Sequence, residues 1–211
     1  MGSTSYTWDS LNRMTSVTVG GSTTNYSYRA DGMRIAKLDN ANPIHNPIAS
    51  YRYDGQMSIE DIDYSGGAVQ KVTDYGLGAR GIDAMYVSQS GTTTAVYPIY
   101  DTHGNMMSTL TKQGAGGYLP ANLRTFDAWG NIRVGAPTGD PKGRYCANLG
   151  HKQDDESGLV YMRARYYEPG SGRFVSQDPA LQGHNWFVYC GNVPTQYADS
   201  TGKYFDLGCV G

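Results

Sequence analysis

The stretch LVYMRARYYEPGSGRFVSQDP (159–179), followed by NWFVYCGNVPTQYADSTG (185–202), carries most of the information about fold and function in this chain. Its aromatic and β-branched residues are interrupted by Gly and Pro, which predicts short strands joined by tight turns. The same stretch supplies Arg165, Asp178 and Asp199. An arginine together with two carboxylates is a side-chain set suited to acid–base chemistry on a nearby peptide bond.

The composition limits the classes of protein to which the chain can belong. Its 211 residues can bury a real core and fit either one large all-β domain or one domain plus an appendage. Seventeen basic and 19 acidic residues give a formal charge of −2, so we expect no nucleic-acid partner and no attraction to acidic membranes. Eighteen tyrosines and 28 glycines indicate aromatic strands with tight turns, and a core built largely from Tyr.

Neither a membrane span nor a classical signal peptide is predicted. No apolar run reaches the roughly 18 residues that a span requires, and MGSTSYTWDS (1–10) lacks both a basic start and an apolar stretch. Export would therefore depend on another part of a longer polypeptide or on another route. The three cysteines, Cys146, Cys190 and Cys209, cannot all pair with one another, and they leave the redox compartment open.

A degenerate repeat runs through the chain. Its copies are WDSLNR (8–13), YDTHGN (100–105) and FDAWGN (126–131), with looser forms in YRADGMR (28–34) and YDG (53–55). The Asp can accept a hydrogen bond from a backbone N–H two residues later, and Gly or Asn can supply the positive φ of a hairpin return. Each copy therefore predicts a hairpin bend, flanked by strands such as SVTV (16–19).

These copies resemble the YD repeat, and residues 150–203 resemble the Rhs repeat-associated core domain of bacterial polymorphic toxins and insecticidal toxin complexes. The residues that match the core domain in order and spacing are Gly158-Leu159, Tyr161, Ala164-Arg165-Tyr166-Tyr167, Pro169, Gly172-Arg173-Phe174, Ser176, Asp178-Pro179, Tyr189, Asn192, Pro194, Asp199 and Gly202. The resemblance covers this segment closely and the rest of the chain loosely.

The resemblance implies an all-β fold in which YD-repeat hairpins form a curved, spiralling antiparallel sheet. This sheet would be a partial shell, and the C-terminal core segment would roll inward. The implied division is a repeat segment at 1–149, the core domain at 150–203 and a short tail at 204–211. The first and last strands would have exposed edges, which favour pairing with missing repeats or with another copy in a homo-oligomer.

The resembling family cuts its own chain just after an Asp-Pro-x-Gly-Leu motif, using an arginine and two aspartates. Carried over by motif, these residues are Arg165, Asp178 and Asp199, and the cut would fall between Lys203 and Tyr204. Ser200 stands where the family has proline, and Lys203 stands where it has leucine. The implied partner is the protein's own C-terminal segment or effector, within an exported system at the cell surface or outside the cell.

Other interpretations of the same residues stay open. Asp199 and Asp178 also suit ordinary turns, and Arg165 could pair with Glu168. The chain would then be a noncatalytic module for structure, adhesion or carbohydrate binding. Glycan hydrolysis by the two carboxylates is a third interpretation, which would require an open groove.

We expect neither a metal nor a cofactor. His45, His103, His151 and His184 are far apart and lack metal-ligand spacing. The acidic triplet at 154–156 suggests a solvated turn, and Cys190 suggests a small buried residue in a strand-like run rather than a nucleophile.

Overall fold

The protein is built almost entirely from antiparallel strands and turns. The computed structural model describes residues 3–40, 47–114, 116–181, 184–204 and 206–207, so His45 and Cys209 lie outside the described residues. Its main sheet has eleven strands, each paired with the next in sequence. They are β1 (Thr4–Trp8), β2 (Met14–Val19), β3 (Ser22–Tyr28), β4 (Arg34–Asp39), β5 (Pro47–Asp54), β6 (Met57–Ser65), β7 (Ala68–Gly78), β8 (Gly81–Gln89), β9 (Thr92–Tyr100), β10 (Met106–Lys112) and β11 (Tyr118–Ala121).

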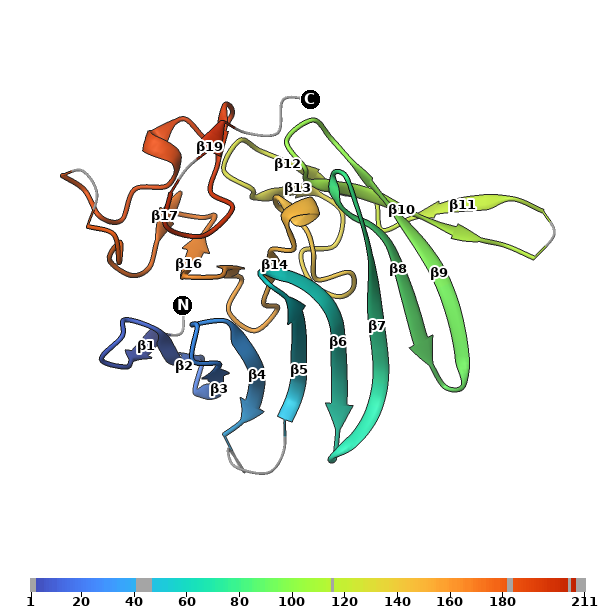
Figure 1. Ribbon diagram of the computed structural model, residues 1–211, viewed down its shortest axis with the longest axis horizontal. Helices are drawn as coiled ribbons and strands as arrows, with labels where there is room; N and C mark the ends of the chain where they lie inside the picture. Colours follow the sequence, from blue (N-terminus) through green and yellow to red (C-terminus); the bar gives the residue numbers. More distant parts are fainter. Residues whose placement is uncertain (1–2, 41–46, 115, 182–183, 205, 208–211) are drawn as a thin grey trace.

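Three smaller sheets follow in the C-terminal part. They consist of β12 (Thr125–Phe126) with β13 (Ile132–Val134), then β14 (Lys152–Gln153), β15 (Val160–Met162), β16 (Arg165–Glu168) and β17 (Arg173–Phe174), and last β18 (Tyr197–Ala198) with β19 (Asp206–Leu207). Two single 3₁₀ turns, η1 (Ala147–Leu149) and η2 (Cys190–Asn192), lie between them. In Figure 1 the main sheet curves, and the segment around η1 and β14 lies on its hollow side. The predicted all-β fold, with an inward-rolled C-terminal segment, is confirmed.

The aromatic-Asp repeat forms the predicted bends. Asp101 Oδ1 accepts hydrogen bonds from the N–H groups of His103 and Asn105, each at 2.9 Å. Asp127 binds the N–H groups two and four residues later in the same way, and so does Asp9. The fourth residue after each aromatic has a positive φ in all three copies: Asn12, Gly104 and Gly130. Hydrogen bonds between the Asp side chain and the backbone of the same repeat copy therefore fix these turns.

Tyrosines form much of the core, as the composition predicted. One buried cluster joins β2 and β3 of the main sheet to β15 and β16, and contains Met14, Val17, Tyr26, Leu159, Tyr161 and Tyr166. A second cluster lies within the C-terminal part and contains Tyr145, Cys146, Val160, Met162, Tyr167, Phe174, Tyr189, Cys190 and Ala198. Tyrosine suits such contacts because its ring packs while its hydroxyl still binds a polar partner.

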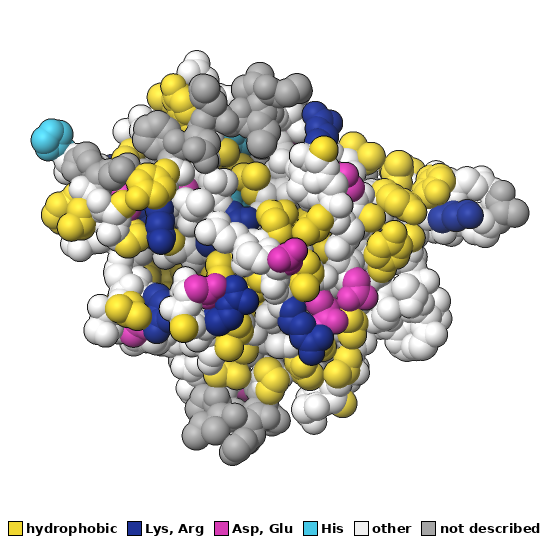
Figure 2. All heavy atoms as spheres, viewed as in Figure 1, with side chains coloured by type: hydrophobic (Ala, Val, Ile, Leu, Met, Phe, Trp, Pro, Cys, Tyr) yellow, Lys and Arg dark blue, Asp and Glu magenta, His cyan; other side chains and the backbone are white. Residues whose placement is uncertain are grey.

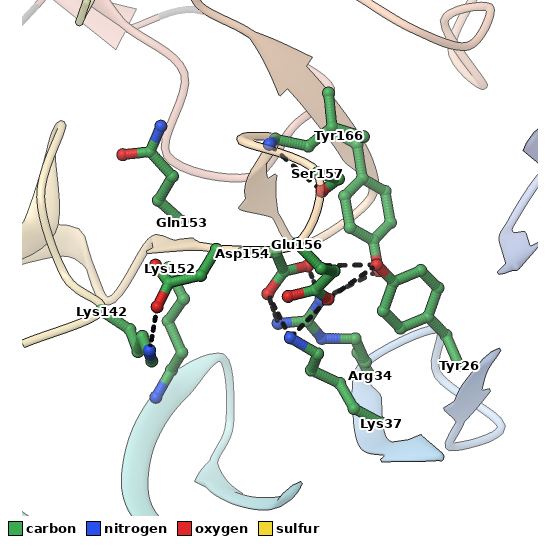
Figure 3. A network of polar contacts seen from close by, with 12 residues as sticks. Tyr26, Arg34, Lys37, Lys142, Lys152, Gln153, Asp154, Glu156, Ser157 and Tyr166 are labelled. Carbon is green, nitrogen blue, oxygen red and sulfur yellow. Dashed lines mark hydrogen bonds and ion pairs between the residues drawn. The ribbon is translucent and has the colours of Figure 1, made fainter. Parts of the chain in front are cut away.

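A buried ion pair connects the main sheet to the C-terminal part. Arg34, on β4, is fully buried and binds both carboxylate oxygens of Asp154, with N–O distances of 2.5 and 3.1 Å. The Lys37 ammonium lies 3.4 Å from Asp154 and 2.5 Å from Glu156. Figure 3 shows this group beside Tyr26 and Tyr166. Burial would raise the pKa of Asp154, but Arg34 and Lys37 hold that pKa below its ordinary value.

The expected solvated turn at the acidic triplet is wrong for Asp154, which is only 3% exposed. Asp155 and Glu156 are half-buried and pair with lysines, Lys142 and Lys37 respectively. The neighbouring Lys152 is also buried, and its ammonium contacts the Asp61 carboxylate of β6. Asp154 and Lys152 therefore attach the C-terminal part to the sheet, because their partners, Arg34 and Asp61, come from strands more than 90 residues earlier.

Charges of both signs lie beside one another on the face of the molecule shown in Figure 2, in keeping with the small net charge. Among the described residues, no helix is long and apolar enough to cross a membrane. The outermost strands of the main sheet are β1 and β11, and all four residues of β11 are exposed.

Replacing Arg34 by Met should reduce the free energy of unfolding by about 3–5 kcal/mol, because it leaves the buried Asp154 carboxylate without its bidentate partner. Arg52→Met is the matched control, since Arg52 is exposed and its pair with Glu60 should contribute about 1 kcal/mol or less. Urea unfolding, followed by tyrosine fluorescence, measures the free energy of unfolding of both variants. The double variant Arg34→Met with Asp154→Leu should recover part of the loss; equal costs for Arg34 and Arg52 would contradict this role.

Candidate active site

Arg165 occupies the centre of the candidate site. It is the first residue of β16, directly after the turn from β15, and is 3% exposed. Its guanidinium stacks on the Phe174 ring, with its central carbon 3.6 Å from the ring centroid. Burial lowers the pKa of Arg165, whereas the charges of Asp178 and Asp199 oppose that shift. A guanidinium titrates so far above neutral pH that it stays a fixed cation here.

The two carboxylate oxygens of Asp199 have different partners. One faces Arg165, and the other faces a tight turn of the backbone. Its Oδ2 lies 3.3 Å from an Arg165 nitrogen. Its Oδ1 accepts the N–H groups of Thr201, Gly202 and Lys203 at 3.1, 2.7 and 3.1 Å. Burial raises the pKa of Asp199 above its ordinary value, although Arg165 and these N–H groups act in the opposite direction. The carboxyl group is therefore poised to hold a proton more readily than an exposed aspartate.

The turn at 199–203 docks on the hairpin between β15 and β16. The Gly202 carbonyl oxygen accepts a hydrogen bond from Arg165 Nε at 2.5 Å, and the Thr201 carbonyl accepts one from the Ala164 N–H at 3.2 Å. Gly202 has a φ of +72°, and a Cβ there would lie 2.0 Å from the Met162 carbonyl oxygen. Only glycine fits such a close approach of two backbones.

Asp178 is buried near the same cation without a direct ion pair. No described cationic group lies within 4.0 Å of its carboxylate. One of its oxygens accepts the Ala180 N–H at 2.9 Å, which leaves the other for a different partner. Its charge raises the pKa of Arg165 more strongly than the charge of Asp199 does. The structure thus brings Arg165 and Asp199 into contact, and Asp178 lies close enough for its charge to raise the pKa of Arg165.

The residues predicted to flank the cut differ from these three in exposure. Lys203 and Tyr204 both have exposed side chains, and Tyr204 is 48% exposed. The Lys203 N–H donates to Asp199 Oδ1 and to Thr201 Oγ1, at 3.1 and 3.3 Å. The end of the buried turn therefore coincides with the segment in which the resemblance predicts cleavage.

Three contacts at the site could not be predicted from the sequence. The Trp186 carbonyl accepts a hydrogen bond from Arg165 at 3.2 Å. His151 Nε2 lies 3.5 Å from the Ser200 carbonyl oxygen and 3.4 Å from an Arg163 nitrogen. His151 is fully buried, and burial together with the Arg163 charge lowers its pKa to about 3. It is isolated in the sequence from the residues it contacts, so no spacing pattern could have identified it.

The other candidate groups do not assemble into a site. Among the described residues, no three His, Cys, Asp or Glu side chains are arranged to hold a metal ion. Cys190 is buried, as expected, but it begins η2 instead of continuing a strand. Arg165 pairs with Asp199 and makes no ion pair with Glu168, which was the alternative partner.

No protein-family model matches the chain. It is 30% identical over 213 residues to the tRNA3(Ser)-specific nuclease WapA of Bacillus spizizenii, a match that covers 96% of this chain and 8% of that protein. It is 29% identical over 188 residues to the probable deoxyribonuclease RhsA of Dickeya dadantii, covering 82% of this chain and 12% of RhsA. Among solved structures, TcdB2-TccC3 matches with a TM-score of 0.72 and 20% identity, over 94% of this chain and 10% of that one. The chain thus spans about a tenth of the length of these proteins.

Gly202→Ala should disturb the docked turn far more than Gly158→Ala disturbs its own turn, although the two glycines have nearly the same φ. Gly158 has a φ of +73° and no atom within 4 Å of the position that a Cβ would take, so Gly158→Ala should cost only the backbone penalty of about 1–2 kcal/mol. In Gly202→Ala the added carbon would clash with the Met162 carbonyl oxygen, so the turn must move away from the β15–β16 hairpin. Amide exchange at Ala164, whose N–H binds the Thr201 carbonyl, should accelerate in Gly202→Ala only; equal protection in both variants would contradict the docking.

His151 should make the protein less stable as the pH falls. Its pKa is about 3 in the folded protein and roughly 6.5 when unfolded, so the unfolded state binds more protons between these values. The stabilisation that the neutral His151 ring provides is fully present above the pKa of the unfolded state. Below that pKa, the free energy of unfolding falls by up to about 1.4 kcal/mol per pH unit. Urea unfolding from about pH 6.5 to pH 5 should give a flatter profile for His151→Gln than for the wild type. Parallel profiles would rule out this titration.

Proposed function

Because the chain belongs to the Rhs/YD-repeat family, we propose that it is the terminal shell and plug segment of an Rhs-type toxin-encapsulating protein that cuts its own backbone. In this proposal residues 1–149 form the shell segment, residues 150–203 form the core domain, and residues 204–211 begin the part that is released. The bond that the family motif implies is Lys203–Tyr204. The observation that carries the proposal is the contact of buried Arg165 with both Asp199 and the backbone of the turn at 199–203.

Two carboxylates near one cation can divide acid and base work between them. When such groups interact, one retains a proton while the other stays ionised and can take a proton from water. Burial raises the pKa of Asp199, which supports an acid role for it, while Asp178 would activate the water. Arg165 would stabilise the negative charge that develops on the attacked carbonyl oxygen. The position of the turn against Arg165 supports self-cleavage over a reaction on a separate substrate.

The partner in this proposal is the protein's own C-terminal effector, held on the hollow side of the shell before release. The exposed strand β11 and the outer edge of β1 support pairing with further repeats or with a second copy. We propose export or surface display as part of a toxin system. A nucleic-acid partner for this segment is disfavoured by its formal charge of −2.

Asp178→Asn and Asp199→Asn should each slow self-cleavage by at least about 100-fold, since each removes a proton-transfer group. Intact-mass measurement of the purified chain over time, between about pH 4 and pH 8, follows the loss of the C-terminal peptide. The wild type should cut fastest at intermediate pH, because one carboxyl group must be protonated and the other ionised.

Asp31→Asn is the matched control. Asp31 is an exposed turn aspartate between β3 and β4 that pairs with Arg29, so its variant should cut like the wild type. Circular dichroism verifies that all variants are folded. A folded wild-type chain that stays intact across this pH range would favour the noncatalytic module, in which Asp199 only caps its turn.

A further inference from the structure

Lys152 and Asp61 form a buried contact between the C-terminal part and the main sheet. Lys152 lies on β14 and Asp61 lies on β6, 91 residues earlier in the chain. Only 5% of the Lys152 side chain and 10% of the Asp61 side chain are exposed. The Lys152 ammonium lies directly against Asp61 Oδ2, and Figure 3 shows the Lys152 side chain extending from β14 toward the sheet. The contact therefore brings together the two groups, an amine and a carboxyl, from which an amide bond is made.

The hydroxyl group of Tyr75 contacts both partners. It donates a hydrogen bond to Asp61 Oδ2 at 2.7 Å and accepts one from the Lys152 ammonium at 3.2 Å. The Tyr75 ring lies 4.5 Å from the Lys152 nitrogen, and the Tyr51 ring lies 5.4 Å from it. Burial holds the pKa of Tyr75 well above its ordinary value, so its hydroxyl keeps its proton. The carboxyl group is therefore polarised by a fixed donor in an aromatic enclosure.

These surroundings favour a neutral pair. Burial is the largest influence on Lys152 and lowers its pKa, although the charge of Asp61 opposes that shift. Asp61 Oδ1 is buried and has no hydrogen-bond partner among the described residues. An unpaired oxygen is more costly to bury on a carboxylate than on a carboxylic acid. Transfer of one proton from Lys152 to Asp61 gives an amine and a carboxylic acid, which are the reactive forms of both groups.

Other lysine pairs of the sheet lack this combination of features. Lys37 lies 3.4 Å from the buried Asp154, but Arg34 binds both oxygens of that carboxylate. Because arginine stays charged, Asp154 remains an anion, which a nucleophile does not attack readily. Lys71 lies between two carboxylates that are 35% and 52% exposed, and water stabilises the charged forms there. The pair on β6 and β14 combines burial with a carboxyl group that no described arginine binds.

We propose that Lys152 and Asp61 join in an isopeptide bond, a covalent link that fastens β14 of the C-terminal part to β6 of the main sheet. The link would hold the C-terminal part in place even when the noncovalent contacts around it open. It would also restrict the unfolded chain, because it closes a long loop between two distant residues. The inference does not depend on whether the chain cuts itself.

The reaction is a condensation that releases one water molecule. After its proton has passed to Asp61, the Lys152 nitrogen adds to the Asp61 carboxyl carbon, and the Tyr75 hydroxyl stabilises the negative charge on the carbonyl oxygen. The nitrogen then gives a proton to the carboxyl hydroxyl as the C–O bond breaks and water leaves. The product is a neutral amide, so two buried charges disappear. A cavity of about 290 Å³, lined by all three residues, can receive the water. No oxidant or cofactor is needed.

Intact-mass measurement of the folded full chain, freshly purified and after incubation, tests the inference. The expected chain is lighter than its sequence by the mass of one water molecule. A tryptic digest should contain one branched peptide that joins Asp61 to Lys152. If the chain cuts itself, the large fragment should show the same deficit, so the two reactions are measured separately. A chain that keeps its full mass in both samples would overturn the inference, whether or not it is cut.

Variants identify the residues that react. Lys152→Met should abolish the loss of water, and Tyr75→Phe should slow it by at least about tenfold, because it removes the donor to the carboxyl group. Lys71→Met is the matched control, since Lys71 also bridges the sheet and the C-terminal part but should leave the cross-link intact. Circular dichroism verifies folding, and the branched wild-type peptide decides the matter if Lys152→Met does not fold. A loss of water that persists in Lys152→Met would overturn the inference.

Discussion

The buried pair of Arg34 and Asp154 determines how the two parts of the molecule fit together. Arg34 lies on β4, and Asp154 directly follows β14, 120 residues later. Four tyrosine rings, those of Tyr26, Tyr51, Tyr161 and Tyr166, surround the guanidinium at 4.4 to 5.7 Å. A buried charge without its partner is costly, so any other placement of the C-terminal part would leave one of these ions unpaired. The pair therefore specifies one position for β14 to β17 on the sheet.

That placement in turn fixes the candidate site. The strands β15 and β16 pack on the main sheet through Leu159, Tyr161 and Tyr166, and the turn between them receives the segment at 199–203. Arg165 points into this junction because β16 begins there. A strand is a more rigid support than a loop, which suits a residue that must hold both a carboxylate and a carbonyl in fixed positions.

Asp199 has a double role that a single carboxyl group can fulfil. One oxygen organises three consecutive backbone N–H groups, and the other faces Arg165. The same residue thus shapes the peptide that lies against the site and contributes to its charge. This arrangement explains how a sequence that suits an ordinary turn, Asp-Ser-Thr-Gly, also places a carboxylate against Arg165.

The sequence by itself determined the bends of the sheet, and its resemblance to the core domain pointed to Arg165, Asp178 and Asp199 as candidate residues. Asp9, Asp101 and Asp127 bind N–H groups two and four residues away, so the spacing of a few residues is enough to predict them. The tertiary structure alone decided the burial of Asp154, the contact of His151 with Ser200, and the peptide bond that faces Arg165. Turns depend on atoms that the chain holds close together, whereas buried ion pairs depend on which distant segments meet when apolar faces pack.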